Sequence, residues 1–109
     1  MKINNYGFIV RGPDYQPEID TATLTSCRFK TRIIAVESLD QACLAADQLC
    51  VEGVQVIELC GGFSADDASV IRAHIQGAIP VGYMCFTEAE QLKLAALPDL
   101  AQFEQSPHR

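Results

Sequence analysis

The stretch Val54-Gln55-Val56-Ile57-Glu58-Leu59-Cys60-Gly61-Gly62-Phe63-Ser64 decides the fold. Its first part is short, apolar and dense in Val and Ile, which predicts a strand over residues 54–60. Gly61 and Gly62 end that strand. Ser64, three residues before Asp67, has the pattern of a helix N-cap. A strand that turns directly into a helix is the repeating unit of α/β folds, so we expect this class.

The alternation of strands and helices extends in both directions from this turn. Apolar runs predict further strands at residues 6–10, 29–36 and 79–86, and the residues up to about Ser26 between the first two are expected to be a polar loop. Capping patterns predict helices that begin at Ser38, Ser64 and Thr87 and end near Gly53, Gly77 and Pro98. The predicted order of elements is therefore β-β-α-β-α-β-α, with about four mostly parallel strands and three helices. We expect them to form a single α/β domain over residues 1–109, with a polar, frayed tail from about residue 102. The orientation of the first strand stays open.

The surroundings of the sheet follow from the same pattern. Its strands are short and almost wholly apolar, which is typical of strands covered by helices on both faces. A small parallel sheet also has exposed edges that can pair with another copy. We therefore expect a homo-oligomer, with a dimer as the simplest form.

Composition excludes several classes of partner. The 109 residues are 49% hydrophobic and carry a net charge of −6, so the surface repels nucleic acids and anionic membranes. Neither a membrane-spanning run nor a signal peptide is present, which predicts a cytoplasmic protein. Five cysteines without a C-x-x-C pair, and only two histidines, predict no metal site and no disulfide framework. No cofactor-binding motif is complete, so no cofactor is expected.

Ligands of parallel α/β sheets bind beyond the carboxyl ends of the strands. The turn with Gly61, Gly62 and Ser64 lies at such an end and offers free amides beside a helix N-terminus, which favours a small polar or anionic ligand. Neighbouring strand ends add further candidate ligand-binding residues: Cys85 and, if the first strand is parallel, Arg11 and Asp14. The alternative is a tight turn without a ligand, since no lysine follows it and Asp66 and Asp67 compete with an anion.

Glu58 and Cys60 form a second candidate site. Alternation along the strand places both on one face, and a carboxylate among apolar residues is costly unless it has a partner. If Glu58 is buried, its pKa rises, which suits a cofactor-independent acid/base enzyme of the racemase or isomerase kind. The alternatives are an ion pair with Arg11, Arg32 or Arg72, a side chain that reaches water, and a cysteine that acts only as a small buried residue. A third function class is a structural protein whose main surface is a homo-oligomeric interface.

The string Ile57-Glu58-Leu59-Cys60-Gly61-Gly62-Phe63, with Ile79-Pro80-Val81-Gly82 downstream and Gly12-Pro13-Asp14 upstream, resembles a small bacterial α/β family of unknown function. The resemblance covers most of residues 6–86 and implies a compact α/β domain, but no catalytic residue. Members of that family typically have a His-Arg pair after the Pro-Asp loop, and Arg-Phe-Asp and His-Pro-Gly after the last strand. Here those places read Pro17-Glu18-Ile19 and Cys85-Phe86-Thr87-Glu88.

Overall fold

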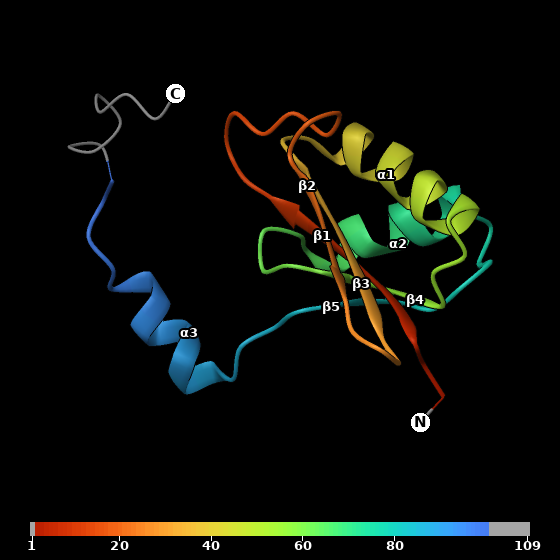
Figure 1. Ribbon diagram of the computed structural model, residues 1–109. Helices are drawn as coiled ribbons and strands as arrows, with labels where there is room; N and C mark the ends of the chain where they lie inside the picture. The colour runs from red at the N-terminus through yellow and green to blue at the C-terminus, as the bar shows by residue number, and fades with distance from the viewer. Residues whose placement is uncertain (1, 101–109) are drawn as a thin grey trace.

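Five strands form one mixed sheet in the order β2-β3-β1-β4-β5 in the computed structural model, which describes residues 2–100 (Figure 1). Only β2 runs antiparallel to its neighbour, and β1, β3, β4 and β5 are parallel. The strands are β1 Asn5–Arg11, β2 Thr21–Thr25, β3 Lys30–Val36, β4 Val56–Leu59 and β5 Val81–Tyr83. The α/β class is confirmed, and the first strand, whose orientation the sequence left open, lies parallel in the centre. The predicted tail from about residue 102 lies outside the described residues.

The prediction of about four strands was one short. Strand β2 occupies part of the stretch that was expected to be a polar loop up to Ser26. Its sequence Thr-Ala-Thr-Leu-Thr has no apolar run because every residue of this edge strand is exposed. A tight turn, in which the Ser26 amide donates to the Phe29 carbonyl (2.9 Å), joins it to β3. The alternating threonines were the available signal for a strand.

The helices begin where the capping patterns predicted. Helix α1 spans Leu39–Val51, α2 spans Ala65–His74 and α3 spans Glu88–Ala95. Ser38 and Ser64 each form a reciprocal capping box with the third helical residue, and the Thr87 hydroxyl accepts from the Glu90 amide. After α1, Gly53 adopts φ +81°, a left-handed conformation that ends helices at little cost only for glycine.

The core lies between one face of the sheet and the helices α1 and α2, which cover the same face (Figure 1). Gly7 in β1 permits this close packing, because a Cβ there would lie 3.2 Å from the side chains of Leu49 and Val54. The largest fully buried side chains are Ile9, Val36, Leu49, Ile57, Leu59 and Ile71.

The expectation that helices cover both faces was wrong. Both right-handed β-α-β crossovers, β3-α1-β4 and β4-α2-β5, advance in the same direction along the sheet, so their helices fall on one side. Within residues 2–100, no helix packs on the opposite face, which we call the open face. The strand register and side-chain alternation place these residues on it: Tyr6, Phe8, Val10, Ala22, Leu24, Thr31, Ile33, Val56, Glu58 and Gly82.

Helix α3 follows β5 through residues 84–87 and stands apart from the sheet (Figure 1). None of its residues is buried. Among residues 2–100, no helix combines the length and apolarity needed to cross a membrane.

Candidate functional site

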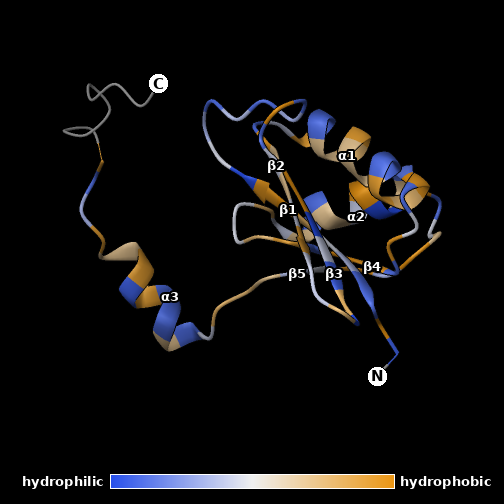
Figure 2. Cartoon of the chain, viewed as in Figure 1, coloured by the Kyte–Doolittle hydropathy of each residue, from blue (hydrophilic) through white to orange (hydrophobic). Residues whose placement is uncertain are grey.

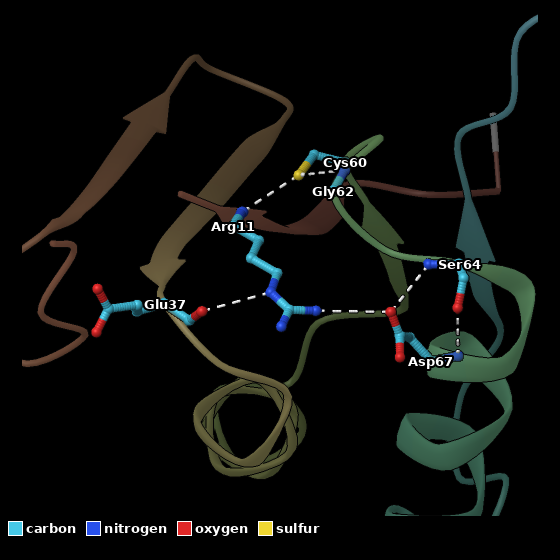
Figure 3. A network of polar contacts seen from close by, with 6 residues as sticks. All are labelled: Arg11, Glu37, Cys60, Gly62, Ser64 and Asp67. Carbon is cyan, nitrogen blue, oxygen red and sulfur yellow. Dashed lines mark hydrogen bonds and ion pairs between the residues drawn. The ribbon is translucent and has the colours of Figure 1, made fainter. Parts of the chain in front are cut away.

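The carboxyl ends of β1, β3, β4 and β5 lie at one edge of the sheet because these strands are parallel. This edge brings Arg11, Cys60, Gly62 and Ser64 together, four residues predicted from the sequence that come from two separate segments, the end of β1 and the turn after β4 (Figure 3). Glu37 and Asp67 complete the cluster, although the sequence analysis did not select them as site residues. We refer to these six residues as the rim cluster.

Arg11 lies at the centre of the rim cluster. Its Nε donates to the Glu37 carbonyl (3.4 Å), and its guanidinium approaches the Asp67 carboxylate (3.6 Å), as Figure 3 shows. The same guanidinium lies over the ring of Phe63, 5.5 Å from the ring centroid, which is a cation–π distance. Arg11 therefore connects the ends of β1 and β3 to the first turn of α2.

The N-terminus of α2 already holds an acidic group. The Asp67 carboxylate accepts from the Ser64 amide (3.0 Å), and the Ser64 hydroxyl accepts from the Asp67 amide (3.1 Å). Asp67 thus interacts with the helix dipole, with one free amide and with Arg11 at the same time. An anion that approached this turn would meet a fixed negative charge, so the geometry favours an uncharged ligand over an anionic one.

Two backbone amides converge on the sulfur of Cys60. The Arg11 amide donates to Sγ at 3.2 Å and the Gly62 amide at 3.4 Å (Figure 3). Gly62 favours this approach, because a Cβ there would lie 3.2 Å from the Arg11 Cβ and 3.4 Å from the Cys60 sulfur and would crowd both. The Cys60 sulfur is therefore held in position by the backbone of two strand ends.

Glu58 is exposed and belongs to the open face of the sheet. Its carboxylate accepts from the Tyr6 hydroxyl (2.8 Å), whereas Arg11 and Arg32, two of its predicted partners, pair with Asp67 and Glu52. Burial, then the hydrogen bond and the charge of Glu58, raise the pKa of Tyr6 to about 12. Glu58 therefore interacts with Tyr6 on the open face, whereas Cys60 interacts with backbone amides in the rim cluster.

The remaining sequence-predicted residues lie around the rim. Asp14 is exposed with φ +68°, and its amide donates to a Glu37 carboxylate oxygen (2.8 Å). Gly61 and Cys85 do not join the rim cluster but line a pocket beside it.

This pocket has a volume of about 450 Å³ and lies between the Gly61–Ala65 turn, the end of β5 and α3. Most of its lining is apolar or aromatic, and none of the lining side chains is charged. The lining residues are Gly61, Phe63, Ser64, Ala65, Tyr83, Met84, Cys85, Phe86, Gln91 and Leu94. Sequence reasoning missed the aromatic members, although Phe63 directly follows the two glycines and Tyr83 and Phe86 flank Cys85.

Within residues 2–100, no three histidine, cysteine or acidic side chains gather in a way that would hold a metal ion. The described cysteines are all unpaired thiols.

Comparison with known proteins identifies a family but no activity. A family model described as "Family of unknown function (DUF6506)" matches residues 4–99, which is most of the chain. The chain therefore belongs to this family. Neither the curated proteins nor the solved structures contain a match.

Proposed function

We propose that this member of the DUF6506 family is a binding module for a small, uncharged and partly aromatic ligand, held at the carboxyl rim of the sheet. The observation that carries this proposal is the pocket of about 450 Å³ beside the Gly61–Ala65 turn. Its volume falls within the range of about 300–1,000 Å³ that is usual for small-molecule sites.

The lining supports the chemical class of the ligand. Tyr83 and Phe86, both exposed, supply aromatic surface on which a flat ring can stack, and the buried Phe63 forms the base of the lining. Ser64 and Gln91 supply a few polar atoms that can orient the ligand through hydrogen bonds. A mostly apolar lining with few polar groups is the usual composition of a small-molecule pocket.

The electrostatics argue against phosphates and carboxylates as ligands. Arg11, the cation of the rim cluster, is engaged by Asp67 and by the face of Phe63. The Asp67 carboxylate also accepts a hydrogen bond from the Ser64 amide, which would otherwise be free to bind an anion. The glycine turn predicted a polar or anionic ligand, and of these two classes we propose the polar, uncharged one.

A thermal-shift screen tests the proposal with two sets of probes: neutral aromatic amides and alcohols, and inorganic phosphate with simple carboxylates. A ligand at about 100 times its Kd stabilises the folded state by about 2.7 kcal/mol, which corresponds to a rise in Tm of about 10 °C or more for a domain of this size. We expect such shifts only from the neutral aromatic set. No stabilising compound in that set, or shifts produced by the anions alone, would overturn the proposal.

Two glycines offer a matched pair of variants for the same screen. A Cβ at Gly61 or at Gly82 meets no atom within 4 Å, and neither glycine has a positive φ. Gly61→Val fills the pocket and should abolish the thermal shift, whereas Gly82→Val lies outside the pocket lining and should leave it unchanged. Equal binding by both variants would place the ligand elsewhere.

A second candidate, the cofactor-independent acid/base enzyme, is favoured by one observation. Two backbone amides that donate to the Cys60 sulfur hold it at the carboxyl edge of the sheet, where ligands of α/β sheets bind. Glu58, which the sequence paired with Cys60, is hydrogen-bonded to Tyr6 on the open face instead. In this candidate, Cys60 would therefore exchange a proton with the substrate without help from Glu58. Thiol labelling, described in the Discussion, tests this role.

A further inference from the structure

We infer that the chain forms a dimer in which helix α3 of each copy packs on the open face of the other. Two surfaces of the same chain lack an apolar partner: the open face of the sheet and the outer sides of α3. A second copy supplies both missing surfaces in one encounter, related by a two-fold axis.

The open face is a continuous apolar surface. The register places Leu24, Thr31, Tyr6 and Val56 side by side across four strands, and Ala22, Ile33, Phe8 and Glu58 form the next row. Stacking of Tyr6 on Phe8 and on Phe29 extends the aromatic part of this surface. None of these side chains belongs to the buried core, which lies on the other face of the sheet.

Exposed apolar side chains are concentrated at the end of the described chain. Twelve large hydrophobic side chains are exposed in residues 2–100, and seven of them lie between Tyr83 and Leu100. Figure 2 shows hydrophobic residues along α3 although the helix stands apart from the sheet. Such a concentration in one segment of the chain, of which Leu92 and Leu94 lie on α3, is typical of a protein interaction site rather than of scattered surface residues.

Helix α3 needs apolar surroundings on two sides. Leu92 and Leu94 are two positions apart, so about 200° of helical rotation separates them. Leu94 lines the pocket beside the Gly61–Ala65 turn of its own chain. Leu92 points away from that side and is 71% exposed. A helix with apolar residues on opposite sides is stable when both sides are buried.

A second copy is the occupant that keeps the rest of the structure intact. If α3 turned onto the open face of its own chain, Gln91 and Leu94 would leave the pocket that they line. Packing on a partner covers Leu92 while Leu94 stays in place. The charged groups near this contact are already paired within the chain, since Glu58 accepts from Tyr6 (2.8 Å) and Lys93 pairs with Glu90 (3.2 Å), so the packing does not have to form a new ion pair.

The test uses three full-length variants that each add one negative charge. Leu92→Glu places it on α3, Leu24→Glu on the open face, and Val51→Glu at the end of α1, away from both surfaces. All three residues are exposed (71%, 62% and 84%), so the monomer fold should persist, which circular dichroism checks. Sedimentation equilibrium then measures the dimer dissociation constant of each variant.

We expect the unmodified chain to be a dimer. Leu92→Glu and Leu24→Glu should each raise the dimer Kd by at least tenfold, because each buries an unpaired charge in an apolar contact. Val51→Glu should leave it within a factor of about two. Two results would overturn the inference. One is that the unmodified chain stays monomeric even at 100 times the concentration used for sedimentation. The other is that Leu92→Glu or Leu24→Glu leaves the dimer Kd unchanged. This test is independent of the ligand proposal, since it needs no ligand.

Discussion

The Arg11 guanidinium lies 3.6 Å from the Asp67 carboxylate and joins the end of the central strand to the first turn of α2. Each member has further partners, since Arg11 donates to the Glu37 carbonyl and Asp67 accepts from the Ser64 amide. The two residues are 56 positions apart and interact only because β1 and the turn after β4 are neighbours at the sheet edge. This contact positions the turn that forms one wall of the pocket.

Asp67→Ala should lower the free energy of unfolding by about 1 kcal/mol. Most of this loss comes from the helix cap, because the ion pair with Arg11 is partly exposed to solvent and screened. Urea denaturation measures the effect. Asp66→Ala in the same helical turn removes the same charge without the cap and should cost less than about 0.5 kcal/mol. Equal losses from both variants would mean that charge alone, not the cap, stabilises this turn.

Arg32→Met should lower the free energy of unfolding by about 2 kcal/mol. Arg32 Nε donates to the Glu52 carboxylate at 2.9 Å, and both side chains are about one-fifth exposed. The substitution leaves a half-buried carboxylate at the C-terminal end of α1, where the helix dipole disfavours negative charge. His74→Gln, which removes the partner of Asp47 in a more exposed pair, is the control and should cost about 0.5 kcal/mol or less.

Glu52 should also make the protein sensitive to acid. Burial disfavours its charged form, but hydrogen bonds from Gln48 and Arg32, with the charges of Arg32 and Lys30, outweigh burial and lower the pKa of Glu52. A pKa lowered by folding adds stability above the pKa of the unfolded carboxyl, and this stability disappears as pH falls through the folded pKa. Denaturation at several acidic pH values should therefore show a steeper loss for the unmodified chain than for Glu52→Gln. Parallel curves would contradict this.

Tyr6 should ionise near pH 12 rather than at its ordinary value of 10.0. The chain has three tyrosines and no tryptophan, so tyrosinate absorbance reports their titration, and Tyr6→Phe identifies the contribution of Tyr6. Glu58→Gln removes a negative charge and should lower the pKa of Tyr6, although burial still holds it above 10.0. Because folding raises this pKa, the associated stability is complete below about pH 10 and falls as pH rises toward about 12. An unchanged titration in Glu58→Gln would contradict the contact.

The thiols should react in a defined order if Cys60 has no catalytic role. Cys27 and Cys85 are exposed and should be labelled first at neutral pH. Cys43 should be slowest, because burial and the charges of Asp40 and Asp47 raise its pKa. Cys60 is half-buried and should be intermediate. Labelling of Cys60 faster than the exposed Cys85, measured by mass spectrometry of the peptides, would instead support the enzyme candidate.

Local patterns were sufficient for most of the elements. Ser38 and Ser64 identified two helix starts because capping depends on residues three positions apart, and the Val54–Ser64 stretch identified a strand, a turn and a helix for the same reason. The competition of Asp67 with an anion also followed from its position in the first helical turn. The threonine-rich β2 was missed because an exposed edge strand has no apolar run to mark it.

The sequence by itself determined the α/β class, the alternation of strands and helices and the turn at Gly61 and Gly62, because these follow from local periodicity and capping. That Arg11 reaches the same sheet edge as this turn was decided by the tertiary structure, which places the first strand parallel in the centre of the sheet. Only the tertiary structure decided that α1 and α2 share one face, so that Glu58 is exposed beside Tyr6 rather than buried, and that Arg11 pairs with Asp67. These features depend on the strand order and on contacts between residues about fifty positions apart, and a local sequence pattern cannot predict such contacts.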